Sequence, residues 1–117
     1  MNIETYYNYC MSLPGAEESF PFNETTLAIK LGGKIFAMMD MEAFEEGINL
    51  KCDPLKAIEL RAEYEDIRPG HHTNKKHWNL VNPNGFLEDD FIRQLTTDSY
   101  NLILNSLPKK EREKLGF

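Results

Sequence analysis

Two alternating segments joined by a pair of glycines are the feature that most constrains the fold of this chain. In Thr25–Leu31, the residues Leu27, Ile29 and Leu31 fall on every second position. In Lys34–Asp40, the residues Ile35, Ala37 and Met39 do the same, opposite Phe36 and Met38. A spacing of two places them on one face of a β-strand. Gly32-Gly33 suits a two-residue hairpin turn, which needs positive φ at both central positions. We therefore predict a hairpin, which Ile48–Cys52 extends to a three-stranded antiparallel meander.

Apolar residues at steps of three and four predict three helices around this meander. They cover Ile3–Ser12, a segment from Asp53 to about Tyr64, and roughly Glu88 to Asn105. Asp53 followed by proline is a strong helix start. The expected inward stripes are Ile3, Tyr6, Tyr7, Cys10 and Leu13 in the first helix, Leu55, Ile58 and Ala62 in the second, and Phe91 or Ile92, Leu95, Ser99, Leu102 and Ile103 in the third.

Two further short strands are expected, one within residues 65–72 and one over His77–Val81, joined by a turn at Thr73–Lys76. Residues 16–24 are expected to form an irregular connection whose Phe20 and Phe22 pack against the sheet. The resulting order is α-β(3)-α-β(2)-α. This order predicts an α+β domain of two layers, with helices packed against one mainly antiparallel sheet.

The chain has 117 residues, which predicts a single domain over residues 1–117. No apolar run is long enough to cross a bilayer. The first residues lack the basic start and apolar core of a signal peptide, so we expect a cytoplasmic location without membrane contact. Cys10 and Cys52 have no CxxC partner and are expected to be reduced.

The stretch from Arg68 to Trp78 concentrates the residues with chemical potential. It holds all three histidines of the chain, the only tryptophan and three positive charges, and it contains no acid. We take as candidate binding residues Arg68, His71, His72, Asn74, Lys75, Lys76, His77 and Trp78. Lysines on the polar faces of the predicted strands would extend the patch: Lys30, Lys34 and Lys51.

Metal binding and catalysis find little support in these residues. Adjacent histidines on a strand point to opposite faces, so His71 and His72 are not expected to share an ion. No HExxH pattern, Cys/His ligand set, nucleophile elbow or phosphate-binding glycine loop is present. We therefore predict no metal site, no cofactor and no enzymatic activity.

Contact with nucleic acid remains open. Lysine and arginine can meet phosphates, and an exposed Trp78 would stack on a base. Against this, the net charge is -6, and Trp78 beside Leu80 is the pattern of a core residue. Three local charges would give only a shallow salt dependence of DNA binding.

Several short motifs stand in order along the chain. The most specific runs from His72 to Asn79 and reads HTNKKHWN. The others are Leu13-Pro14-Gly15-Ala16-Glu17-Glu18, Gly32-Gly33-Lys34-Ile35-Phe36-Ala37, Leu50-Lys51-Cys52-Asp53-Pro54, Ile67-Arg68-Pro69-Gly70, Ser99-Tyr100 and Leu107-Pro108-Lys109-Lys110. Together these motifs resemble the MmcQ/YjbR family of small bacterial proteins, and the resemblance covers nearly the whole chain. Thr73 stands where the family often has methionine, and His71 where it often has an aromatic residue.

The resemblance implies the same α-β(3)-α-β(2)-α order, in a fold similar to type III secretion chaperones and compared with frataxin/CyaY. Family members are commonly labelled DNA-binding by analogy of fold. The leading hypothesis is thus a non-enzymatic protein that binds DNA through residues 68–78. The alternatives are a domain that holds a protein partner, with the chain a monomer or weak dimer, and an anion or nucleotide pocket around Arg68, His72 and Lys76.

Overall fold

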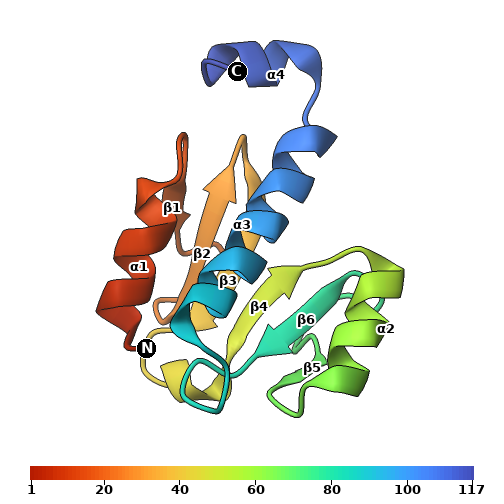
Figure 1. Ribbon diagram of the computed structural model, residues 1–117. Helices are drawn as coiled ribbons and strands as arrows, with labels where there is room; N and C mark the ends of the chain where they lie inside the picture. Colours follow the sequence, from red (N-terminus) through yellow and green to blue (C-terminus); the bar gives the residue numbers. More distant parts are fainter.

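The structure is a computed structural model that describes all residues from 1 to 117. A six-stranded antiparallel sheet forms one layer and three helices the other, which confirms the predicted α+β architecture (Figure 1). The helices are α1 (Ile3–Ser12), α2 (Pro54–Glu63), α3 (Asp89–Ser106) and the short α4 (Lys109–Lys114). The strands are β1 (Glu17–Ser19), β2 (Thr26–Leu31), β3 (Lys34–Asp40), β4 (Ile48–Lys51), β5 (Ile67–Pro69) and β6 (Trp78–Val81).

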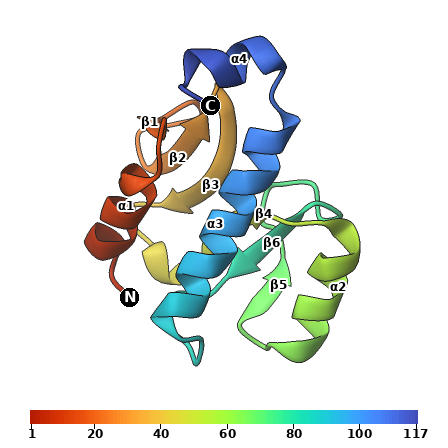
Figure 2. The ribbon, with the colours of Figure 1, turned by 45° about the horizontal axis from the view of Figure 1, so that its top comes forward.

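The strands lie in the order β1-β2-β3-β4-β6-β5, so the connection from β4 through α2 to β5 skips one position, which β6 fills. Helices α1, α2 and α3 cover one face of this sheet, while α4 lies beyond its end (Figures 1 and 2). The opposite face carries no helix. Three elements were not predicted: the edge strand β1, the short helix α4 and a turn of 3₁₀-helix, η1 (Phe44–Glu46).

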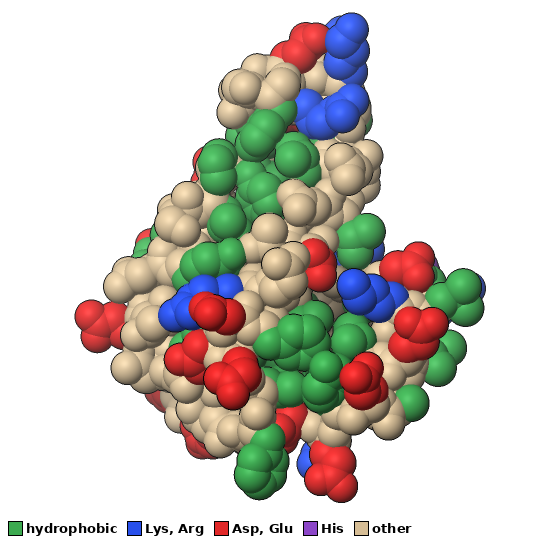
Figure 3. Space-filling model, in the orientation of Figure 1, with side chains coloured by type: hydrophobic (Ala, Val, Ile, Leu, Met, Phe, Trp, Pro, Cys, Tyr) green, Lys and Arg blue, Asp and Glu red, His purple; other side chains and the backbone are tan.

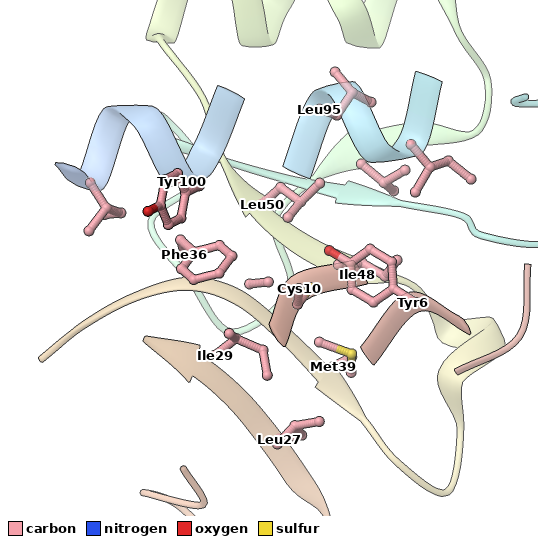
Figure 4. Close-up of a cluster of buried hydrophobic side chains, with 14 of the residues drawn as sticks. Tyr6, Cys10, Leu27, Ile29, Phe36, Met39, Ile48, Leu50, Leu95 and Tyr100 are labelled. Atoms are coloured by element: carbon pink, nitrogen blue, oxygen red, sulfur yellow. The ribbon is translucent and has the colours of Figure 1, made fainter. Parts of the chain in front are cut away.

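The core lies between the sheet and the helices (Figure 4). Leu27 and Ile29 of β2, and Ile48 and Leu50 of β4, face it as the alternation predicted. Strand β3 departs from simple alternation because Ile29 pairs with Ala37 whereas Lys30 pairs with Ile35. Phe36 is the extra residue of this β-bulge, and both it and Ala37 are fully buried in the core. Its ring meets Tyr100 of α3 edge-on, at 5.4 Å between ring centroids.

The side of α2 that faces the sheet differs from the prediction. Ala57 and Leu60 point inward, while Leu55 is 75% and Ile58 61% exposed, so the predicted stripe is wrong. The spacing of Leu55 and Ile58 suits a helix as well as that of Ala57 and Leu60 does. Which pair faces the sheet depends on the direction in which the chain leaves β4. Leu102 of α3, also predicted inward, is at the surface.

The connection between α1 and β2 also differs. Phe20 and Phe22 remain 43% and 66% exposed, so the expectation that both pack closely against the sheet is wrong. The segment before them forms β1, in which Glu17 pairs with Lys30. Backbone hydrogen bonding along the edge of β2 thus replaces the side-chain packing that the aromatic residues suggested.

Candidate functional site

The histidine loop, residues 70–77, connects the edge strand β5 to β6 and turns around Gly70. The Gly70 N–H donates to Trp78 O at 2.9 Å, and its carbonyl accepts from Lys75 Nζ at 2.9 Å. A Cβ at position 70 would lie 2.8 Å from the Cβ of Trp78 and 2.1 Å from Thr73 Oγ1. Such distances are far inside van der Waals contact, so only glycine fits beneath the loop.

Arg61 of α2 holds the other end of the loop, a role that the sequence pattern did not reveal. Its Nε donates to Asn79 Oδ1 at 2.6 Å, and its Nη2 donates to Trp78 O at 3.1 Å and to Lys75 O. Asn79 is buried and also donates to Ala57 O. A buried amide with charged and backbone partners fixes β6 and the loop against α2.

His71 and His72 stand side by side, against the prediction that they point to opposite faces. The premise failed because β5 ends at Pro69 and both histidines lie in a bend. His72 has a left-handed backbone, with φ 56°, which brings the two imidazole centroids to 3.9 Å. A non-glycine residue in this region is uncommon, and such strain gathers at functional sites.

The histidine pair lies at the rim of a pocket on the helix-free face, which we call the histidine pocket. Its volume is about 440 Å³. The backbone N–H of His71 donates to Asn49 Oδ1 at 2.9 Å, and this contact buries Asn49 although it points away from the core. The pocket is lined by Phe22, Asn23, Thr25, Thr26, Met38, Met39, Asp40, Glu46, Gly47, Asn49, His71, His72 and Leu80.

The cations of the predicted patch are dispersed. Arg68 lines a separate hollow with Glu45, Glu46 and Asp66, so acids surround its charge. Lys75 is engaged with the Gly70 carbonyl, whereas Lys76 is exposed and no side-chain hydrogen bond holds it. The sequence suggested an anion pocket around Arg68, His72 and Lys76. Of these three residues, only His72 lines the histidine pocket.

The three proposed extensions of the patch also separate. Lys51 is paired with Trp78 in the register of β4 and β6, so it adjoins the stretch 68–78. Lys30 lies on β2 between Glu17 and Ile35. The ammonium of Lys34 is bound to oxygen atoms of Ser106, at the end of α3.

The remaining predicted residues support the loop. Asn74 Oδ1 accepts from the backbone N–H of Lys76 at 2.9 Å, and the Asn74 carbonyl accepts from His77 N at 3.2 Å. Trp78 is half-buried and lies outside the core cluster, so it is not the core residue that its spacing from Leu80 favoured. Thr73 Oγ1 is buried without a hydrogen-bond partner.

The two cysteines are free and belong to the helix-covered face. Burial raises the pKa of Cys10 to about 12, and burial also raises the pKa of the half-buried Cys52 thiol. Both therefore carry a proton at neutral pH and are poor nucleophiles. No group of three or more His, Cys, Asp or Glu side chains is placed to hold a metal ion.

The comparisons with known proteins agree with this architecture. The YjbR family model matches residues 11–102. The chain belongs to the YjbR family. It is 36% identical over 115 residues to YjbR of Escherichia coli strain K12, covering 98% of each protein, and 36% identical over 112 residues to YbdF of Escherichia coli O157:H7, covering 96% of this chain and 92% of YbdF.

Solved structures show the same fold. A crystal structure of a Deinococcus radiodurans protein of the DUF419 family superposes with a TM-score of 0.91 at 33% identity, over 99% of this YjbR-family chain and 88% of that one. A Pseudomonas syringae protein gives 0.75 at 27% identity, over 88% and 99%. The likeness to secretion chaperones and frataxin stays a prediction. None of the helices combines the length and the apolar character needed to cross a membrane.

Proposed function

We propose that this protein is a non-enzymatic binding protein whose histidine pocket takes a nucleotide, either free or as part of a DNA strand. The observation that carries the proposal is the left-handed backbone of His72. It places two exposed imidazoles together at the rim of a pocket, and neither ring takes part in a side-chain hydrogen bond within the protein. Strain of this kind persists where the surrounding structure enforces it, and function is a common reason.

The lining suits the two parts of a nucleotide. Phe22, Met38 and Leu80 offer an apolar surface on which a planar base can stack. The histidine rings offer N–H donors to a phosphate. Asp40 and Glu46 line the same pocket and would repel phosphate, so the phosphate belongs at the histidine rim and the sugar and base donors beside the carboxylates.

Extended contact with duplex DNA is less well supported than contact with a single nucleotide. Arg68 is surrounded by acids, Lys75 is engaged within the loop, and the net charge is -6. Few free cations remain to release counterions from a duplex. We therefore expect weak duplex binding with a shallow dependence on salt between about 50 and about 200 mM.

An NMR titration of the full chain tests the proposal with four probes: adenosine monophosphate, adenosine, inorganic phosphate and a DNA oligonucleotide, single-stranded or duplex. The monophosphate should shift the amides of Phe22, Asn49, His71 and His72, and bind more tightly than adenosine or phosphate alone. If single-stranded DNA shifts the same amides, the histidine pocket binds a nucleotide that is part of a DNA strand. If none of the probes shifts these amides, the proposal is wrong.

A paired variant makes the test specific. His71→Ala/His72→Gly removes both rings, and glycine accepts the φ of position 72 without strain. The monophosphate should then bind at least about tenfold more weakly, a loss of about 1.4 kcal/mol. Lys34→Ala is the matched control, because Lys34 is bound to Ser106 far from the pocket. Equal affinity of both variants would contradict the pocket, and a loss of DNA binding only in Lys75→Ala/Lys76→Ala would move the site to the loop lysines.

A protein partner is a second candidate, and the outer face of α2 favours it. Leu55 and Ile58 are the large apolar residues that this helix presents to solvent. The partner that can be examined directly is a second copy of the chain. Sedimentation at rising concentration should show a weak dimer that Ile58→Gln removes, and a chain that stays monomeric at every concentration would contradict this pairing.

A further inference from the structure

Another hollow lies on the opposite face of the sheet from the histidine pocket, between α2 and α3, and we call it the α2–α3 cleft. Its volume is about 260 Å³. Figure 3 shows it as an apolar depression beside α3, edged by charged side chains, and no histidine is visible on that face. The apolar lining comes from both helices and three strands: Leu50, Leu60, Ile67, Val81, Leu95, Leu102 and Cys52.

The rim of the cleft is balanced in charge. It holds two lysines, Lys51 and Lys56, and two aspartates, Asp53 and Asp98. Lys56 Nζ and Asp98 Oδ2 lie 3.8 Å apart, so this ion pair joins the two helices across the mouth. Lys56 and Asp98 therefore neutralise each other, and the four charges of the rim sum to zero.

Two amide side chains complete the mouth. Asn101 and Asn105 of α3 line the cleft, are exposed and make no side-chain hydrogen bond within the protein. An amide can donate and accept. It therefore suits an alcohol, amide or carbonyl group at the end of an apolar ligand.

We infer that the α2–α3 cleft is a binding site for a small, neutral, mainly apolar molecule that carries one hydrogen-bonding group. The volume is below the roughly 300–1,000 Å³ of pockets that hold drug-sized ligands, which favours a small occupant. A charged ligand would lose its hydration against the apolar floor while facing a rim of no net charge. A neutral ligand loses little and buries apolar surface that water otherwise covers.

Cys52 provides a reporter within the site. It lines the cleft and is half-buried, whereas Cys10 is fully buried beneath α1. In the folded protein an alkylating reagent should therefore modify Cys52, slowly because burial raises its pKa, and leave Cys10 unmodified. A molecule seated in the cleft shields the Cys52 sulfur, so the alkylation rate measures occupancy.

Three six-carbon probes that differ only in the head group test the inference: hexan-1-ol, hexanoate and hexylammonium. Hexan-1-ol should slow the alkylation of Cys52 by iodoacetamide and shift the methyl resonances of Leu60, Val81 and Leu95. Each charged analogue should bind at least about fivefold more weakly, because its head group is desolvated at a rim of no net charge. Hexan-1-ol that changes neither signal up to its solubility limit, or charged probes of equal affinity, would overturn the inference.

A matched pair of variants locates the ligand. Leu102→Gln changes the wall of the cleft and Leu55→Gln makes the same change on the outer face of α2, both at surface positions where folding should persist. Hexan-1-ol should bind at least about threefold more weakly to Leu102→Gln and unchanged to Leu55→Gln. The opposite ranking would place the ligand outside the cleft. His71→Ala/His72→Gly should leave hexan-1-ol binding intact, which separates this site from the histidine pocket.

Discussion

The two sides of α3 show how differently one helix can be used within a small domain. On the side of α1, Tyr6 Oη and Thr96 Oγ1 are joined at 2.8 Å in the interior, and Tyr9 bonds to Thr97. On the side of α2, the connection is the Lys56–Asp98 ion pair at 3.8 Å, with the cleft below it. We call the contact between α1 and α3 the closed seam, because hydrogen-bonded side chains fill it. We call the contact between α2 and α3 the open seam, because only an exposed ion pair spans the cleft.

The difference extends to the interior of the two halves of the molecule. In the half built from α1, β1, β2 and β3, the buried Tyr6 hydroxyl is bonded to Thr96 of α3, and the Phe36 carbonyl accepts from Ser99 Oγ of α3 at 2.6 Å. The half built from β4, β5, β6 and α2 borders the α2–α3 cleft and holds an unpartnered hydroxyl at Thr73. The histidine pocket draws its lining from both halves. We therefore expect the first half to contribute more of the stability.

The largest expected effect comes from opening the closed seam. Tyr6→Ala removes a fully buried ring that packs on Phe44 and bonds to Thr96, and should cost about 3–5 kcal/mol of unfolding free energy. Tyr6→Phe keeps the ring and should cost about 1–2 kcal/mol. Urea unfolding measures both. If Tyr6→Ala lowers the unfolding free energy by less than Leu102→Gln does, the contact between α1 and α3 is not the more stable one.

Alkaline pH should weaken the same seam. Burial raises the pKa of Cys10 from 9.0 to about 12, and burial also raises the pKa of Tyr6 well above its ordinary value. Because the folded state holds these protons more tightly, the stability they contribute is complete below pH 9 and declines as the pH rises toward 12. For Cys10 the decline is about 1.4 kcal/mol per pH unit. Cys10→Ala should flatten the profile measured by urea unfolding, and an unchanged slope would contradict this origin.

Removing the unpartnered hydroxyl of Thr73 should instead increase the stability of the protein. Thr73→Val removes a buried hydroxyl that has no partner beneath the histidine loop, and should raise the unfolding free energy by about 1 kcal/mol. Thermal unfolding measures the change, with Thr97→Val as the control, because Thr97 is bonded to Tyr9 and its loss should destabilise. If Thr73→Val destabilises as much as the control, the hydroxyl has a partner in solution.

The smallest effect is expected at the open seam itself. Asp98→Asn removes an ion pair whose side chains are 55% and 38% exposed, and the loss should stay within about 0.5 kcal/mol. Urea unfolding at low and high salt measures it. A cost similar to that of Tyr6→Phe would mean that the two sides of α3 are equally important for folding.

The sequence predicted most helices and strands well, but it predicted less well how they pack and pair. Alternation in Thr25–Leu31 and the glycine pair placed the hairpin, because a period of two and a turn are local properties. The side on which α2 packs was missed, since Leu55 with Ile58 and Ala57 with Leu60 both have helical spacing. The bulge at Phe36 was not predicted, because it depends on how β2 and β3 pair and neither strand's sequence determines this pairing alone.

The candidate site remains a prediction, and the sequence did not reveal its geometry. The cluster of histidines and lysines in residues 68–78 pointed to one loop, and His71 and His72 of this loop line the histidine pocket. Its other walls, such as Phe22 and Asp40, come from segments distant in the chain. The pairing of His71 with His72 depends on one backbone angle, and the holding role of Arg61 on a crossing of α2 over β6. Neither leaves a signal in residue spacing.

The shortness of the two edge strands has a consequence for how this domain meets other molecules. β1 and β5 have three residues each, β1 carries Glu17 and Glu18, and β5 ends in Pro69, which has no N–H to offer. Short, charged or proline-bearing edges resist pairing with another extended chain. We therefore expect the sheet neither to grow by strand addition nor to seed aggregates. Recognition is left to the hollows on its two faces and the outer face of α2.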